Sequence, residues 1–386
     1  MTRPLAIIFL TIFVNLIGFG IIVPLLPFYA ETFGASPLII GLLFAVFSLC
    51  QLISAPALGD LSDRYGRRPV LVFSLAGTVV SFVMLAVAHS IAMLFAARIV
   101  DGLSGGNIST ARAYVADITG PQDRARAYGL IGAAFGLGFI LGPAISGVLA
   151  PVSYTAPIWA AAAITLVATG MALLWLPETV HRAHAGTGNP FRYFPDLVRR
   201  PIVRRVLAID FLYWFAFSIF QTTFALFVAR RFGLDAPRTG YFLAAFGLLG
   251  AVIQGGMIRP IVRHLGDKPT FRLGLVCASI GLVAAAGVHS VPGLALSLVP
   301  LAFGIGFGHP TMSSLVSQVA RGDEQGRVQG AASAVESLGR VAGPVWGSAS
   351  LQHVGETIPY ISAAGFLGFT LLLSVGFGIT DGPDQT

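Results

Sequence analysis

The sequence predicts an all-α membrane protein of twelve transmembrane helices, and three observations lead to that prediction. The chain has 386 residues, of which 55% are hydrophobic and 11% are charged, whereas soluble domains carry about a quarter charged residues. Apolar runs of about 20 residues, enough to cross a hydrocarbon core as a helix, recur along its length. Because lipid offers no hydrogen-bond partners, each run must satisfy its own backbone groups, which favours helices throughout.

The apolar runs place the expected helices in two groups of six. They are 5–30, 37–58, 69–89, 91–117, 125–150 and 155–177, followed by 204–229, 237–258, 271–289, 293–318, 327–351 and 356–380. No small-residue cleavage site follows the first run, so we expect it to be retained as a span. The chain is therefore expected to divide into six-helix bundles at 1–178 and 204–386. The linker between them, 179–203, is rich in glycine and proline.

Loop charges predict the orientation of these spans. Eighteen of the 24 Lys and Arg residues fall in or near loops on the side of the amino terminus, and three, Arg230, Arg231 and Arg238, fall on the other side. Basic loops stay in the cytoplasm, so both termini and the linker are expected there. The basic residues form no patch, which excludes a nucleic-acid partner. Cys50 and Cys277 lack metal-ligand and redox spacing, so no metal site or disulfide is expected.

Two patterns recur in both halves of the chain. YGRRP at 65–69 recurs as LGDKP at 265–269, and Gly142-Pro143 recurs as Gly343-Pro344, at offsets of 200 and 201. Nearly equal offsets indicate an internal duplication. The two bundles are therefore expected to be pseudo-symmetric, with a substrate site between them.

The most specific segment is GDLSDRYGRRPVL at 59–71, between the second and third spans. Its glycines permit a tight turn, and its charges place both signs at the membrane surface. The residues concerned are Gly59, Asp63, Arg64, Gly66, Arg67 and Arg68. On charge alone, a solvated basic loop is the alternative interpretation.

This segment resembles the signature loop of the major facilitator superfamily. Further matches are Leu94, Arg98 and Gly102 in the fourth span, YVADITGPQDRAR at 114–126, GLGFILGPAISG at 136–147 and LPET at 176–179. Together they resemble the drug/proton antiporter branch, and specifically the tetracycline/proton antiporters. The resemblance implies the major facilitator fold and a monomeric transporter of the bacterial inner membrane. Its partners would be a small-molecule substrate, protons and lipid, with no cofactor and no enzymatic reaction.

The sequence departs from the tetracycline exporters at two positions. That family carries functional acidic residues in helices 1 and 3, and the matching residues here are Asn15 and Ser81. Neither side chain titrates near neutral pH. Tetracycline is therefore not the expected substrate, and the proton site is expected elsewhere.

The signature loop is expected to act as a gate. By the resemblance, Asp63 would lie near the amino end of the 327–351 span, where the helix macrodipole attracts an anion. Arg67 would pair with Asp117 at the end of the fourth span. Both contacts would hold the cytoplasmic side closed.

Small residues predict close helix packing. Gly138, Gly142 and Gly343 belong to runs of small residues spaced four apart, which lets helix backbones approach closely. Pro143 and Pro344 remove helix hydrogen bonds, so a hinge at these positions is a compatible second interpretation.

Charged residues within spans are functional hypotheses, because their burial in lipid is costly. Arg98, Asp101 and Arg112 share one face of the 91–117 span, and the resemblance implies that this face lines a central cavity. Asp101 is the first candidate for a proton carrier, loaded and unloaded as Arg98 moves. A permanent ion pair is the alternative.

The second half offers further candidates for proton coupling. Glu336 is the second candidate, with Arg340 one turn away, and the alternative is that the two neutralise each other. His309 also titrates near neutrality, and the alternative is a neutral histidine hydrogen-bonded within the packing.

One face of the 204–229 span predicts a substrate-binding wall, formed by Asp210, Trp214, Phe217 and Gln221. Asn15 and Arg112 are expected to contribute to substrate binding from the first half. Ordinary core packing is the alternative for the aromatic residues. Asp210 is expected near the cytoplasmic edge, a poor position for a buried acid.

The expected function is proton-coupled efflux of small amphipathic compounds by alternating access. No ATP-hydrolysis motif occurs in the sequence, so the energy is expected from an ion gradient. One alternative is an uptake symporter for a sugar or organic acid. Another is a flippase for lipids or lipid-linked sugars, in which Arg98 and Arg112 would bind a head-group phosphate.

Overall fold

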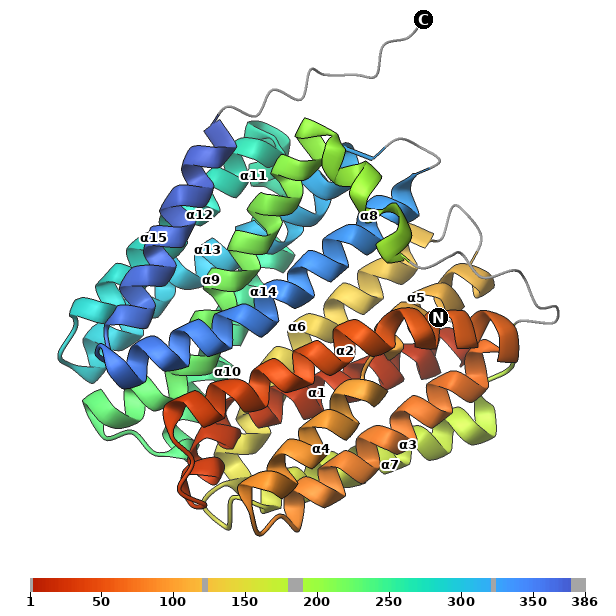
Figure 1. The fold of residues 1–386 in the computed structure, drawn as a ribbon, viewed down its shortest axis with the longest axis horizontal. Helices are drawn as coiled ribbons and strands as arrows, with labels where there is room; N and C mark the ends of the chain where they lie inside the picture. Colours follow the sequence, from red (N-terminus) through yellow and green to blue (C-terminus); the bar gives the residue numbers. More distant parts are fainter. Residues whose placement is uncertain (1–2, 120–123, 180–189, 321–323, 376–386) are drawn as a thin grey trace, which may run out of the picture.

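The computed structural model describes residues 3–119, 124–179, 190–320 and 324–375, which fold into two bundles of helices (Figure 1). Residues 180–189 of the expected linker, and 376–380 of the expected last span, lie outside these ranges. The helices of the amino bundle are α1 (Arg3–Glu31), α2 (Pro37–Tyr65), α3 (Arg67–Ala86), α4 (Ile91–Ser104), α5 (Asn107–Ile118), α6 (Arg124–Leu149) and α7 (Ala156–Trp175).

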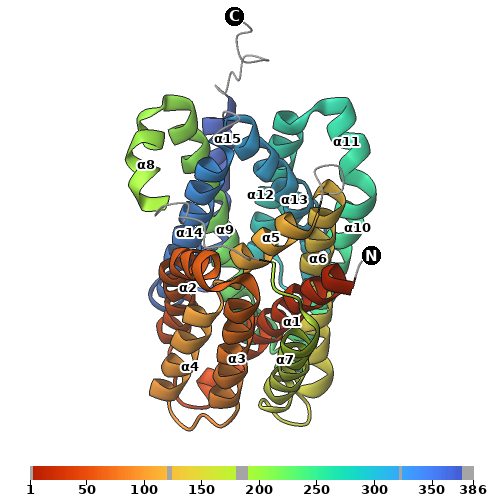
Figure 2. The ribbon, with the colours of Figure 1, turned by 90° about the vertical axis from the view of Figure 1, so that its right-hand side faces the viewer.

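The short helix α8 (Pro190–Arg199) precedes the carboxy bundle and packs against two of its helices, α9 and α14. The elements of the carboxy bundle are α9 (Pro201–Phe232), α10 (Ala236–Val252), the π-helical turn η1 (Ile253–Met257), α11 (Ile258–Leu265), α12 (Asp267–Gly287), α13 (Val291–Gln318), α14 (Gln325–His353) and α15 (Ile358–Val375). Figure 2 views the assembly from the end that carries α8, with the carboxy bundle above the amino bundle.

The internal repeat is visible in the backbone. Gly66 joins α2 to α3 with φ 106°, and Gly266 joins α11 to α12 with φ 82°. Only glycine adopts such angles without strain. Ser90 and Ser290, again 200 residues apart, cap α4 and α13 by accepting from a backbone N–H three residues on. The two pseudo-symmetric bundles expected from the sequence are therefore confirmed, while the boundaries at 178 and 204 stay predictions.

Ten helical spans in the described residues are long and apolar enough to cross a membrane. The two other predicted spans correspond to the α4–α5 pair and to α14, which has 29 residues. α4 has 14 residues and α5 has 12, so each is too short to cross a membrane alone. α14 carries Glu336 and Arg340 in its middle, which lowers its hydropathy. The twelve-helix architecture holds.

The predicted span 91–117 is interrupted at a position where no break was expected. α4 ends at Ser104 and α5 begins at Asn107. Two side chains of α2 satisfy carbonyls near the interruption. Gln51 donates to the Gly105 carbonyl over 3.0 Å, and Ser54 donates to the Gly102 carbonyl over 3.1 Å. Irregular backbone at membrane depth is tolerated because neighbouring side chains supply these hydrogen bonds.

The bundles meet through α2 with α14 and through α6 with α10. A Cβ on Gly41 of α2 would lie 2.5 Å from the Pro344 carbonyl oxygen of α14, so the two backbones are in close contact. Beside them, the Leu38 amide donates to Gln352 Oε1 over 3.0 Å. These contacts close the end of the assembly that carries the loops 32–36, 150–155 and 354–357.

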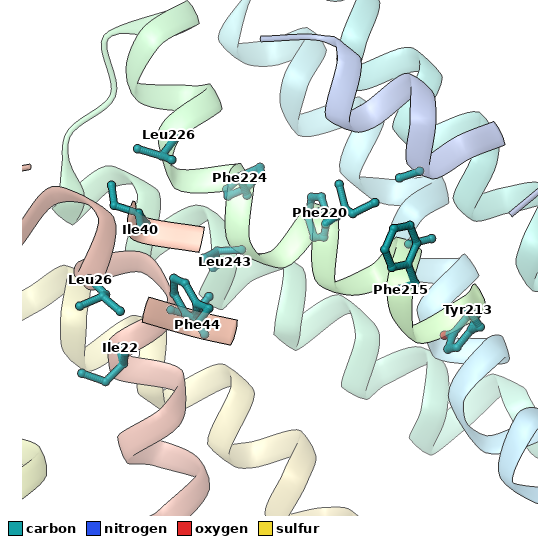
Figure 3. Packing of buried hydrophobic residues seen from close by; sticks show 14 of the residues in the cluster. Ile22, Leu26, Ile40, Phe44, Tyr213, Phe215, Phe220, Phe224, Leu226 and Leu243 are labelled. Atoms are coloured by element: carbon teal, nitrogen blue, oxygen red, sulfur yellow. The ribbon is translucent and has the colours of Figure 1, made fainter. Parts of the chain in front are cut away.

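An apolar cluster extends across both bundles and reinforces that closed end. Figure 3 shows Ile22, Phe44, Leu243 and Phe224 among its buried members, from α1, α2, α10 and α9. If the bundles separated at this end, water would contact these side chains. Keeping them buried stabilises the closed end by about 25 cal/mol per Å² of apolar surface.

Glycine packing between α6 and α1 yields a stability prediction. A Cβ on Gly142 would lie 2.6 Å from the Gly20 Cα and 2.8 Å from the Ile17 carbonyl oxygen, both of which are backbone atoms. Gly142→Val should therefore destabilise the protein by about 1–3 kcal/mol through overpacking. Thermal unfolding in detergent measures this, with Gly170→Ala as control, because a Cβ at Gly170 meets no atom within 4 Å. An unchanged unfolding temperature for Gly142→Val would contradict this close packing.

Candidate functional site

A cavity of about 1120 Å³ lies between the two bundles. It reaches from Pro143 and Pro344 in the middle of the helices to Arg67 and Arg327 at the end opposite the packed interface. Its apolar wall includes aromatic rings from both bundles, among them Phe19, Phe47 and Phe139 from the amino bundle and Trp214, Phe217 and Phe246 from the carboxy bundle. Its ionisable residues are Asp60, Asp63, Arg67, Asp101, Arg112, Asp210, Tyr213, His309, Arg327, Glu336 and Arg340.

All the residues predicted to bind substrate line this cavity. They are Asn15 of α1, Arg112 of α5, and Asp210, Trp214, Phe217 and Gln221 of α9. The side chain of Arg112 is exposed. One face of each of α1, α5 and α9 thus borders the same space, although these helices lie far apart in the sequence.

Seven residues from three helices form one cluster in the carboxy bundle, which we call the α9–α13–α14 cluster. Its members are Asp210, Tyr213, Trp214 and Phe217 of α9, His309 of α13, and Glu336 and Arg340 of α14. The His309 ring lies 4.6 Å from the Trp214 ring, 5.3 Å from Phe217 and 5.5 Å from Tyr213, between ring centroids. The histidine is therefore held among aromatic rings that also wall the cavity.

Asp210 is more deeply buried than its sequence position suggested. The residue is 1% exposed, and both carboxyl oxygens lack a hydrogen-bond partner within the described residues. Its expected place near the cytoplasmic edge stays a prediction. Three further buried atoms lack a hydrogen-bond partner within the described residues: the Tyr213 hydroxyl, His309 Nε2 and Arg340 Nε. The cluster therefore contains several buried polar atoms that ordered water or a ligand would satisfy.

Glu336 and Arg340 do not neutralise each other directly, and that alternative is not supported. Within the described part of the chain, no ion pair joins them within 4.0 Å. Arg340 Nη2 instead donates to Ser337 Oγ over 3.2 Å, and its Cζ lies 5.2 Å from the centre of the Trp214 ring. This distance permits a cation–π contact.

Arg98 and Asp101 form an ion pair of 2.7 Å in α4. Asp101 lines the cavity, but Arg98 does not, so the predicted common face is divided. Arg98 is 1% exposed, and its Cζ lies 4.1 Å from the centre of the Phe47 ring of α2. The division arises because a buried guanidinium packs against an aromatic ring while its partner reaches toward water.

The signature loop forms a network at the open end of the cavity. Arg67 pairs with Asp63 and donates through Nη1 to Ser62 Oγ over 2.7 Å. Arg67 Nε also donates to Asp117 Oδ2 over 3.2 Å, which is the pair expected from the sequence. Asp63 contacts Arg67, while its predicted approach to the start of α14 stays a prediction.

Glu178 is a structural member of this network that the sequence analysis did not single out. Its carboxylate accepts from the Arg67 amide over 2.9 Å and from the Arg68 amide over 3.2 Å. It thereby caps the start of α3, where unsatisfied N–H groups and the helix dipole attract an anion. The LPET segment was the available signal for it. Gly59 lines the cavity, and Arg64 points outward as an exposed side chain.

The predicted packing glycines lie at helix contacts. A Cβ on Gly138 would lie 2.5 Å from the Leu16 Cβ of α1, and one on Gly343 would lie 2.6 Å from the Phe215 carbonyl oxygen of α9. The following prolines, Pro143 and Pro344, line the cavity. A hinge at these prolines stays a prediction.

The chain is similar to a family of known proteins in sequence and to a solved transporter structure in fold. A family model described as Major Facilitator Superfamily matches residues 8–344. The class G tetracycline resistance protein of Vibrio anguillarum is 35% identical over 352 residues, covering 89% of each chain. Multidrug resistance protein 1 of Bacillus subtilis is 29% identical over 377 residues, covering 97% of this chain and 95% of that protein. The crystal structure of the human organic anion transporter MFSD10 has a TM-score of 0.74 at 26% identity, covering 96% of this chain and 99% of that one.

The Arg98–Asp101 geometry predicts a large stability effect. Asp101→Asn should destabilise the protein by about 3–5 kcal/mol, because it leaves the buried Arg98 charge uncompensated. The paired change Arg98→Met with Asp101→Leu should recover most of that loss, since it removes both charges. Thermal unfolding in detergent distinguishes these variants, with the exposed Asp196→Asn of α8 as control. Equal unfolding temperatures for Asp101→Asn and the control would refute a structural role for the pair.

Proposed function

This chain belongs to the major facilitator superfamily, and we propose that it exports small amphipathic compounds in exchange for protons. Members of this family are transporters, and the apolar spans place the chain in a membrane as a multi-pass protein. The observation that carries the proposal is the cavity of about 1120 Å³, walled by aromatic rings and a few charges. Such a space holds a drug-sized compound together with water.

The orientation of the cavity supports export. It opens at the end that carries the signature loop and α8, where most of the basic loops lie. Basic loops stay in the cytoplasm. On that basis both termini are cytoplasmic, and the cavity collects compounds from the cytoplasm or the inner leaflet. Reopening at the packed end would then release them outside.

A proton gradient supplies enough energy for this cycle. One charge moved through about 100 mV is worth about 2.3 kcal/mol, which sustains a gradient of about fifty-fold. The proposed coupling residues form two groups: Asp101 with Arg98 in the amino bundle, and Glu336 with Arg340 and His309 in the carboxy bundle. Asp101 is held by Arg98 at 2.7 Å, whereas Glu336 lines the cavity without an ion pair in the described residues. The geometry therefore favours the carboxy bundle as the coupling site.

The relatives support drug efflux without fixing the substrate. Tetracycline and multidrug resistance proteins are among them, yet Asn15 and the buried Ser81 stand where tetracycline exporters carry acids. We therefore propose amphipathic compounds other than tetracycline, carried by a single monomeric chain.

An organic anion is the second candidate substrate, and one observation favours it. Arg112 is exposed, lines the cavity and has no ion-pair partner within the described residues. A guanidinium so placed binds carboxylates well. The similarity to a human organic anion transporter agrees with that possibility.

Transport in inverted membrane vesicles tests the proposed function. With an acidic interior, vesicles containing the protein should accumulate the cationic dye ethidium or the neutral dye Nile red above the level of vesicles without it. Adding nigericin, which collapses the proton gradient, should abolish the difference. Dye movement that nigericin leaves unchanged would exclude proton coupling. Alkalinisation of the outside medium when intact cells receive an organic acid would indicate an uptake symporter instead.

The gate makes a separate prediction. Asp63→Asn removes the carboxylate that pairs with Arg67 at the cavity mouth. Because partly exposed ion pairs contribute under about 1 kcal/mol, transport should slow by roughly fivefold or less. Dye binding, followed by fluorescence titration, should persist. Wild-type turnover in this variant would count against a gating role, and Asp196→Asn provides the matched control.

A further inference from the structure

The two bundles balance their buried charges differently. In the amino bundle, Arg98 and Asp101 form a one-to-one pair whose net charge is zero. In the carboxy bundle, Asp210 and Glu336 both lie within electrostatic reach of the same guanidinium, that of Arg340. With both acids ionised, this trio carries a net charge of −1 inside a membrane protein, which is costly. One bound proton removes that excess charge.

The surrounding charges leave this imbalance in place. Arg112 of α5 also acts on Glu336 from the other bundle, but it is exposed to the cavity, where water weakens its effect. The remaining titratable side chains of the cluster are Tyr213 of α9 and His309 of α13. Both are held against aromatic rings. The excess carboxyl group therefore has no dedicated buried counter-charge within the described residues.

The positions of the two acids suggest separate tasks. Asp210 is 1% exposed and its oxygens have no hydrogen-bond partner in the described chain, so its neutral form suits this site better than a bare carboxylate. Glu336 is more exposed and lines the cavity. A proton arriving from cavity water would reach Glu336 first and then the more buried Asp210.

Arg340 is held away from both acids in this conformation. Its guanidinium lies 5.2 Å from the centre of the Trp214 ring and donates to Ser337. The Trp214 and Phe217 rings, 5.7 Å apart between centroids, both line the cavity. A flat apolar molecule that stacks on Trp214 would therefore compete with Arg340 for the same ring.

We propose that Asp210 and Glu336 share one exchangeable proton, and that substrate stacking on Trp214 expels it by driving Arg340 onto the carboxyl groups. This proposal deepens the proton-coupled efflux proposed above. Its second part, the expulsion of the proton by substrate, rests on that function. The carboxyl O–H bond breaks, the proton passes to cavity water, and the guanidinium takes its place as counter-charge. When the substrate leaves, Arg340 returns to Trp214 and a proton binds again. The ligands of this site are amphipathic compounds with a flat apolar face, and a positive charge is not required.

Infrared spectroscopy of the reconstituted protein tests the proton site without any substrate. Difference spectra recorded across a pH titration should show a carboxylic C=O band that weakens as pH rises. The band should be absent in Asp210→Asn and in Glu336→Gln, and retained in Asp210→Glu. It should also remain in Asp196→Asn. Persistence of the band in both Asp210→Asn and Glu336→Gln would overturn the proposal.

Proton release on ligand binding tests the coupling. In weakly buffered detergent solution, at a pH where the dye-free site holds its proton, a pH indicator should record about one proton released per Nile red bound to the wild-type protein. Over that pH range Nile red affinity should rise about tenfold per pH unit, and it should level off above the point where the dye-free site titrates. Arg340→Gln should still bind the dye but lose proton release and the pH dependence. Full release in this variant would refute the role of Arg340.

The two assays separate the shared-proton site from the efflux function. If vesicles show no gradient-driven dye transport but the infrared band requires Asp210 and Glu336, the efflux function fails and the proton site stands. If transport is intact in wild type and in both acid variants, the efflux function stands and the shared-proton site is wrong. Elution of each variant as a single sharp peak on size exclusion confirms that it is folded.

Discussion

The structure depends on the inability of hydrocarbon to solvate polar groups. Each span must satisfy its own backbone, and each charge within a span must find a partner or water. Here Arg98, Asp101, Asp210, Glu336 and Arg340 all lie inside the protein or along its cavity. Asp101, Asp210, Glu336 and Arg340 line the cavity between the bundles, whereas the buried Arg98 is satisfied by its pair with Asp101. Most of these charged residues therefore lie along the cavity.

The same constraint explains why two spans depart from an ideal apolar helix. α14 carries Glu336 and Arg340 among small residues that pack against α9, and the α4–α5 pair is interrupted after Ser104. The interruption survives because Gln51 and Ser54 of α2 bond to nearby carbonyl groups. Polar spans are thus supported by specific side chains of neighbouring helices.

The two ends of the interface are built from different interactions. The closed end relies on close backbone approach at Gly41 and on one amide contact from Gln352. The open end carries the charged network of Asp63, Arg67 and Asp117. Packing and weak ion pairs each contribute modest free energies, so two conformers can lie within a few kcal/mol of each other. In the proposed transport cycle, a single proton or bound compound is then sufficient to shift the balance between them.

The sequence by itself determined the twelve spans and the duplication, through hydropathy and through offsets near 200 residues. Contiguous motifs carried the resemblance to the family, and that resemblance supplied the Arg67–Asp117 pair. The sequence also named the cavity residues of α9, because helical spacing places Asp210, Trp214 and Phe217 on one face. The tertiary structure alone decided that Arg98 turns away from the cavity, that Asp210 is fully buried, and that Arg340 lies over Trp214 instead of pairing with Glu336. Those outcomes depend on side chains from other helices, Phe47 for Arg98 and Trp214 for Arg340, whose distances no spacing within one helix encodes.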